Sequence, residues 1–93
     1  MSAVLLCEFP SGEGTARPWI LGRLAPLAVR GGAELQFVGT EEAGVEVIAI
    51  RFADAALAGA TAAAWRAAEP PAAIAIRLLR MEPVPPFPAG LFP

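Results

Sequence analysis

The sequence predicts an α+β fold with the element order βαββαβ. Four segments have the length and apolar character of β-strands, and two segments between them repeat apolar residues at the spacing of an α-helix. The junctions between these segments carry the glycines, prolines and acidic residues that favour turns. This order, in a single domain of 93 residues, predicts a four-stranded antiparallel sheet with both helices on one face.

The strands are expected in four short segments. A continuous apolar run opens the chain, a second segment alternates apolar and polar residues, and an acidic loop over residues 39–44 joins it to a third as a hairpin. In the second segment, Leu35 and Phe37 are expected on one side and Glu34 and Gln36 on the other. The expected strands cover residues 3–9, 33–38, 45–52 and 73–81.

Each helix has a start signal, an apolar stripe and a stop signal. Thr15 and Asp54 are suitable N-cap residues, Gly31-Gly32 should end the first helix, and Pro70-Pro71 the second. Pro26 removes a backbone donor, so the first helix should kink or break there. The residues expected to face inward are Ile20, Leu24, Leu27 and Ala28 in the first helix, and Leu57, Thr61, Ala64 and Ala68 in the second.

The strand at residues 45–52 is apolar on both faces, with Val45, Val47 and Ala49 on one side and Ile48, Ile50 and Phe52 on the other. Such a strand needs cover on both sides of the sheet. Hydrophobic residues make up 56% of this small chain and charged residues 17%, which is more apolar material than one copy can bury. We therefore expect a homodimer, or a larger homo-oligomer, formed through the sheet face.

Residues 1–82 are expected to form the domain, and residues 83–93 a proline-rich arm. The arm is predicted to lie over the neighbouring subunit or its pocket; disorder, or display to an aromatic groove, are the alternatives. A net charge of −2 with scattered arginines argues against nucleic acid as a partner. No apolar window or leader predicts a membrane segment or export, and a lone cysteine fits a cytoplasmic location.

The βαββαβ order, the doubly apolar strands, and the junctions at residues 30–34 and 48–56 resemble the dimeric α+β barrel superfamily. Within it, residues 3–82 are similar to small bacterial proteins of the antibiotic-biosynthesis-monooxygenase type, which have a ferredoxin-like fold. The resemblance implies a pocket for an apolar, aromatic or polyketide-like molecule, and a cofactor-independent monooxygenase, isomerase or cyclase. The chain has no His and no Tyr, which disfavours haem degradation, and no catalytic motif of the family aligns with it.

Glu8 and Arg77 interrupt apolar strands, and a charge between two covered faces needs a partner or a ligand. They are the candidate catalytic residues, with a buried structural ion pair as the alternative. Without a cation beside it, Glu8 would be the best candidate general base. Four residues are predicted to bind substrate, with volume-filling tryptophans and solvated arginines as the alternative. These residues are Trp19, Arg23, Arg51 and Trp65.

Cys7 is expected to be a small core residue, and no cofactor or metal is expected. The second functional hypothesis is a non-catalytic dimer that binds a ligand or has an accessory role. A pocket of roughly 300 Å³ or more, lined by a tryptophan with Arg and Glu together, would favour ligand handling. A pocket filled by the protein's own side chains would favour the accessory role.

Overall fold

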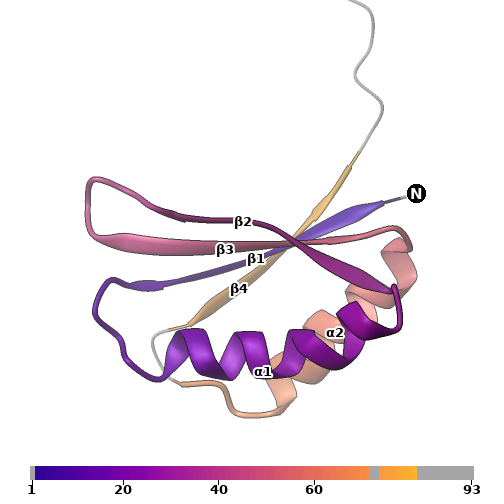
Figure 1. Cartoon of the computed structure of the whole chain (residues 1–93), viewed down its shortest axis with the longest axis horizontal. Coiled ribbons are helices and arrows are strands. Elements are labelled where there is room, and N and C mark those ends of the chain that lie inside the picture. Colours follow the sequence, from indigo (N-terminus) through magenta and orange to yellow (C-terminus); the bar gives the residue numbers. More distant parts are fainter. Residues whose placement is uncertain (1, 72–73, 82–93) are drawn as a thin grey trace, which may run out of the picture.

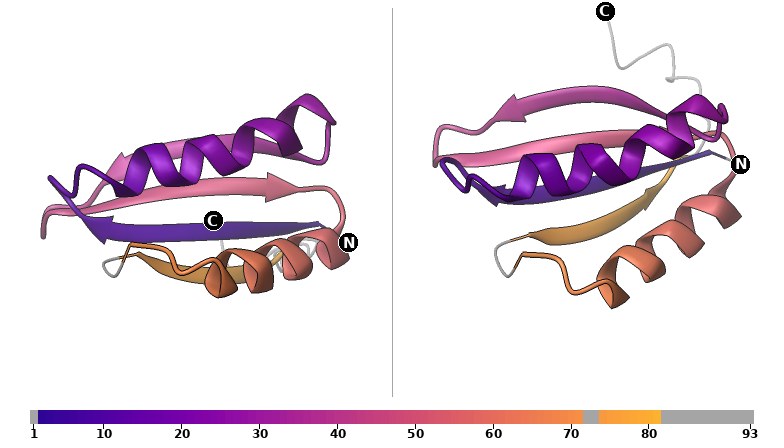
Figure 2. Two further views of the ribbon diagram at one scale, coloured as in Figure 1. Left: turned by 90° about the horizontal axis from the view of Figure 1, so that it is seen from below. Right: turned by 60° about the horizontal axis from the view of Figure 1, so that its bottom comes forward.

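Six elements follow the predicted order, and the computed structural model describes residues 2–71 and 74–81. The strands form one antiparallel sheet in the order β2-β3-β1-β4, and both helices lie on the same side of it (Figures 1 and 2). The predicted ferredoxin-like α+β fold is therefore confirmed. The elements are β1 (Ala3–Pro10), α1 (Ala16–Val29), β2 (Ala33–Thr40), β3 (Val45–Phe52), α2 (Ala55–Ala67) and β4 (Ala75–Arg80).

The core lies between the sheet and the helices. Alternate residues of the two central strands point toward the helices and are fully buried, while Ile20 and Leu24 of α1 and Trp65 of α2 close over them. The strand residues on this side, the helix-covered face, are Ala3, Leu5, Cys7, Phe9, Ile48, Ile50 and Phe52.

Helix α1 differs from expectation at both ends of its apolar stripe. Ala16 is buried and Ala28 is exposed, so the stripe starts one turn earlier than predicted. The helix does not break at Pro26, which lies in its last turns, where few interior hydrogen bonds follow. It ends as predicted at Gly31, whose φ of 76° suits glycine, and the Gly31 and Gly32 amides bond to the Ala28 and Leu27 carbonyls.

The N-terminus of α1 is held differently from the prediction. Thr15 occupies the N-cap position, but its hydroxyl makes no capping bond to the helix. Both the hydroxyl and the amide of Thr15 donate instead to Glu13 Oε1, at 2.8 and 3.1 Å. Both hydrogen bonds lower the pKa of Glu13, and the bond from the hydroxyl has the larger effect.

Helix α2 turns a different stripe inward from the one predicted. Asp54 caps it as expected, with its carboxylate accepting from the Ala56 amide at 2.9 Å. The buried positions are Ala58, Thr61, Ala62 and Trp65, whereas Ala64 and Ala68 are exposed. Burying the indole removes far more apolar area from water than burying two methyl groups, which favours this rotation. The helix also ends earlier than predicted, before Glu69, whose φ is 52°.

A bulge in β2 overturns the predicted alternation of that strand. Leu35 pairs with Ile50, and Phe37 pairs with Ala49, so Gln36 is the additional residue between them. Since neighbouring residues of β3 point to opposite faces, Leu35 and Phe37 also lie on opposite faces. Phe37 is thereby placed on the side away from the helices, where it is 52% exposed.

Among the described residues, no helix covers that second side, which is called the open face below (Figure 1). Its members follow from the strand registers and include Val4, Leu6, Val47, Ala49 and Leu79. The predicted C-terminal arm, residues 83–93, lies outside the described residues.

Candidate functional site

The two candidate catalytic residues meet on the open face. Leu6 pairs with Arg77 and Glu8 with Ala75 across β1 and β4, so Glu8 and Arg77 are diagonal neighbours on one side of the sheet. Their side chains form an ion pair through Glu8 Oε1 and Arg77 Nη2. The pair is not buried as the structural alternative supposed, because the side chains are 23% and 63% exposed. Glu8 has a cation beside it, so the condition for its use as a general base is not met.

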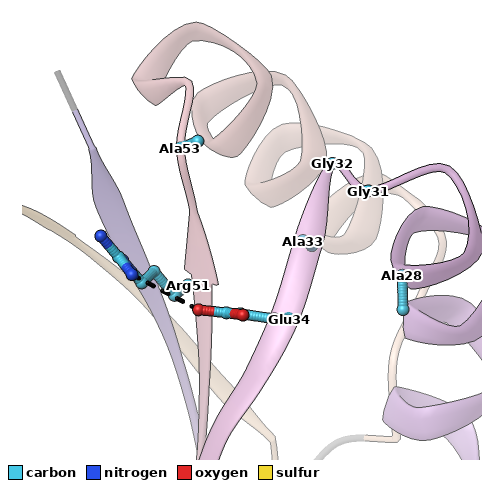
Figure 3. Close-up of a pocket in the computed structure, with 7 residues that line it drawn as sticks. All are labelled: Ala28, Gly31, Gly32, Ala33, Glu34, Arg51 and Ala53. Carbon is cyan, nitrogen blue, oxygen red and sulfur yellow. Dashed lines mark hydrogen bonds and ion pairs between the residues drawn. The ribbon is translucent and has the colours of Figure 1, made fainter.

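Arg51 lies on the same face but has a different partner. It stands opposite Glu34 in the β2–β3 register, and the Nη1–Oε1 distance is 3.4 Å. The two residues border a hollow of about 320 Å³ between the C-terminal end of α1 and the adjoining ends of β2 and β3 (Figure 3). The other lining residues are Ala28, Gly31, Gly32, Ala33 and Ala53. None of them carries an ionisable side chain, so Glu34 and Arg51 supply all of the side-chain charge there.

A shallow depression, called the trough below, crosses the open face. It has a volume of about 340 Å³, and the ion pair of Glu8 and Arg77 borders it. Phe37 borders it from β2, a position that the sequence did not reveal because the bulge places it there. The lining residues are Leu6, Glu8, Phe37, Gly39, Thr40, Glu41, Val47 and Arg77. The trough thus combines an apolar floor with one arginine and two carboxylates.

The predicted aromatic residues form a second cluster on the other side of the sheet. Trp19 and Trp65 meet edge to face, with ring centroids 5.9 Å apart and an interplanar angle of 81°. The Arg23 guanidinium carbon lies 3.9 Å from the Trp19 ring centroid, within cation–π range. Trp65 is 6% exposed and belongs to the core, as the volume-filling alternative supposed, while Trp19 is partly buried.

A groove runs beside this cluster between α1 and α2, with a volume of about 550 Å³. Small side chains on both helices leave the space open, Trp65 lies at its base and Arg23 at its border. The Thr61 hydroxyl is engaged, since it donates to the Leu57 carbonyl at 2.8 Å. The lining residues of this interhelical groove are Gly22, Arg23, Pro26, Leu27, Ala60, Thr61, Ala64, Trp65 and Ala68. None of them is a carboxylate, so the groove offers an apolar wall and one cation.

The six candidate residues therefore form two groups on opposite sides of the sheet. Glu8, Arg77 and Arg51 lie on the open face, and Trp19, Arg23 and Trp65 lie on the helix side. The convergence of a tryptophan, an arginine and a glutamate on one cavity, which would favour ligand handling, does not occur among the described residues. Periodicity assigned each residue to its own element but could not say which sides the elements present to each other.

Other reactive side chains are occupied or shielded. Burial raises the pKa of the Cys7 thiol to about 12, which keeps it protonated and unreactive, as expected for a core residue. Arg17 forms an ion pair with Glu46. In the described ranges, no group of three or more His, Cys, Asp or Glu residues is placed to bind a metal.

None of the helices within residues 2–71 and 74–81 is both long and apolar enough to cross a membrane. No family model matches the chain, and neither a curated protein nor a solved structure matches it.

Proposed function

We propose that this protein is a homodimer that binds an apolar, aromatic or polyketide-like small molecule in the interhelical groove. The observation that carries the proposal is the groove itself, about 550 Å³ of space with Trp65 at its base and Arg23 at its border. This volume lies within the range of sites for drug-sized ligands, roughly 300–1,000 Å³.

The chemistry of the groove favours a flat apolar body with an anionic group. Trp65 and the small residues of both helices offer van der Waals contact, and the edge-to-face contact with Trp19 fixes the position of the Trp65 ring. Arg23 is exposed and is oriented by its contact with the Trp19 ring. A carboxylate or phenolate on the ligand would pair with its guanidinium group.

The groove favours binding over turnover. Its lining holds no Glu, Asp or Cys that could transfer a proton, and the one hydroxyl, on Thr61, already donates to a backbone carbonyl. Binding without chemistry, the accessory function, accordingly fits these residues better than oxygenation, isomerisation or cyclisation.

Catalysis is the second candidate, and the trough is the observation that favours it. Glu8 and Arg77 border the trough beside an exposed aromatic ring, which places an acid and a cation against an apolar surface. A cofactor-independent monooxygenase would consume oxygen there, whereas an isomerase or cyclase would turn over equally well without it. Comparing aerobic with anaerobic turnover of an aromatic substrate separates these two possibilities.

Calorimetric titration of the full-length protein tests the groove. The probes are 2-naphthoate and its neutral counterpart 2-naphthylmethanol. Ala64→Leu fills the groove and should weaken binding of both probes at least about tenfold, because the added isobutyl group occupies the ligand's space. Ala63→Leu, on the same helix and exposed but outside the groove lining, is the matched control and should bind like the wild type.

Arg23→Gln separates the cation from the apolar wall. It should weaken binding of 2-naphthoate but leave binding of 2-naphthylmethanol unchanged. Equal affinity of the wild type and Ala64→Leu for both probes, or no heat of binding at millimolar probe, would refute the groove as a ligand site. Tryptophan fluorescence gives an independent readout of binding, because the sequence has two tryptophans, Trp19 and Trp65, and no tyrosine.

A further inference from the structure

We propose that two copies pack open face to open face about a two-fold axis parallel to the strands, so that Arg77 of each copy lies over Phe37 of the other. This inference rests on the proposed homodimer and specifies its geometry. It makes the trough a shared site, because the partner copy supplies an aromatic ring above the ion pair of Glu8 and Arg77.

The first support is the size and composition of the open face. Four strands about 4.8 Å apart and some eight residues long present about 500 Å² in projection, before side-chain relief is added. This approaches the roughly 800 Å² of accessible surface that each partner gives to a standard interface. Phe37 and Leu79 are large apolar side chains half exposed on this face, with no described element above them.

The second support is a row of residues that crosses the whole sheet. The strand registers place Phe37 of β2, Ala49 of β3, Leu6 of β1 and Arg77 of β4 side by side on the open face. The row therefore has an aromatic ring at one edge, an arginine at the other, and two apolar residues between them. Phe37 and Arg77 both border the trough.

The direction of the two-fold axis follows from the two ends of this row. An axis parallel to the strands exchanges the edges, so β4 of one copy faces β2 of the other and the guanidinium group meets an aromatic face. An axis perpendicular to the strands instead places each edge strand opposite the same strand of the other copy. If that axis passes through the row, Arg77 of one copy lies opposite Arg77 of the other. Like charges in contact disfavour that second arrangement.

The remaining charges are compatible with the first arrangement. Arg77 can keep its in-plane bond to Glu8 while its flat face stacks on the ring, because guanidinium groups bond at their edges. Glu34 and Arg51 pair with each other in a row near one end of the sheet, where they would form part of a polar rim. Aligned sheets cross at about 30°. At this angle, an edge residue that lies about 7 Å from the axis is displaced by only about 4 Å, which is within reach of an arginine side chain.

Cross-linking with a short bismaleimide tests this geometry, because facing sheets pack about 10 Å apart, which is too far for a direct disulfide. In one chain, positions 37 and 77 lie on the two edge strands, about 14 Å apart across two intervening strands, which a short cross-linker does not span. A Phe37→Cys/Arg77→Cys variant should therefore form covalent dimers with the cross-linker, with peptide mapping showing the link between positions 37 and 77. The wild type is the control for Cys7, which is buried and should form no cross-link.

Each single variant separates the alternatives. Arg77→Cys alone, or Phe37→Cys alone, should stay monomeric on a denaturing gel, because the axis parallel to the strands keeps identical edges apart. Efficient cross-linking of Arg77→Cys to itself would overturn the proposal in favour of the axis across the strands. A chain that sediments as a dimer but gives no cross-link in the double variant would place the interface elsewhere, and a chain that sediments as a monomer would remove the homodimer itself.

A second measurement leaves the surface free of added cysteines. Arg77→Gln should raise the dissociation constant of the dimer about 5- to 900-fold, the range expected for losing two cation–π contacts, one from each copy. Arg80→Gln removes an exposed arginine from the same strand, but Arg80 pairs with Ala3 and so lies on the helix side. This matched control should leave the dissociation constant unchanged; an equal effect of both variants would contradict a specific contact by Arg77.

Discussion

The two faces of the sheet differ in how far their apolar side chains are buried within one chain. On the helix-covered face, fully buried side chains such as Phe9 and Phe52 belong to one core cluster with Trp65. On the open face, apolar residues alternate with paired charges, and Phe37 remains half exposed. The comparison teaches that a side chain's contribution to the stability of one chain depends on its face, while the open face is suited to contact with a partner.

The largest expected difference between the faces is in the free energy of unfolding. Phe52→Ala, on the helix-covered face, should lower it by about 3–5 kcal/mol, because the substitution leaves a cavity in a filled core. Phe37→Ala is the matched change on the open face. At low protein concentration, where the chain is not dimeric, its cost should stay below about 1 kcal/mol.

Urea denaturation measures both variants, and repeating it at high protein concentration sharpens the comparison. The Phe37→Ala effect should grow with concentration if the open face is an interface, since dimerisation adds to apparent stability. Equal costs for both variants at every concentration would mean that the faces do not differ in this way.

A smaller effect distinguishes the two sides of α2. Ala58→Leu adds volume to the buried stripe and should cost about 1–3 kcal/mol of stability through overpacking. Ala64→Leu adds the same volume to the interhelical groove and should change stability by less than about 0.5 kcal/mol. Thermal unfolding of the two variants checks this. A larger loss of stability for Ala64→Leu would indicate that Ala64 faces the core, as the sequence predicted.

The pH dependence of stability reports on the helix-covered face through Cys7. Burial raises the pKa of its thiol from 9.0 to about 12, so the thiol ionises in the unfolded chain before it ionises in the native one. The contribution of the neutral thiol to the free energy of unfolding is therefore fully present below pH 9. It is lost as the pH rises from there toward 12, at up to about 1.4 kcal/mol per pH unit.

Denaturation at a series of alkaline pH values measures this slope. Cys7→Ala should remove the thiol's share of it, and the native thiol should react with iodoacetamide only after unfolding. Rapid labelling of Cys7 in the native protein would show that the core is open to solvent.

The smallest effect is expected from the ion pair on the open face. Double-mutant analysis with Glu8→Gln and Arg77→Gln should give a coupling energy of about 0.2–1 kcal/mol, because Arg77 is mostly exposed and water screens the pair. Unfolding measurements at low and high salt check it. A coupling above about 3 kcal/mol at low protein concentration would indicate a desolvated pair and erase this difference between the faces.

The sequence predicted the order of elements because each strand and helix has a local signature. Strand-length apolar runs, Asp54 as a cap and Gly31 at the end of α1 are all local features, and the structure has each of them. The pairing of Glu8 with Arg77 was also within reach, because the βαββαβ topology places β1 beside β4.

What the sequence did not predict depends on contacts between elements. The bulge at Gln36 has no glycine or proline to mark it, so the position of Phe37 on the open face could not be read from alternation. The rotation of α2 depends on how Trp65 fits the sheet, and the run of small residues before it, at positions 59–64, defines no apolar stripe of its own. The separation of the candidate residues into two groups has a different cause, because Glu8, Arg51 and Arg77 lie on the open side of their strands whereas Trp19, Arg23 and Trp65 belong to the two helices.

Sedimentation equilibrium of the full-length wild-type protein over a micromolar concentration series tests most directly whether the open face binds a second copy. We expect a mass approaching twice the 9.6 kDa of the chain, with the Phe37→Ala variant shifted toward the single chain at the same concentrations. A stable, soluble species at 9.6 kDa throughout the series would contradict the homodimer and the shared trough.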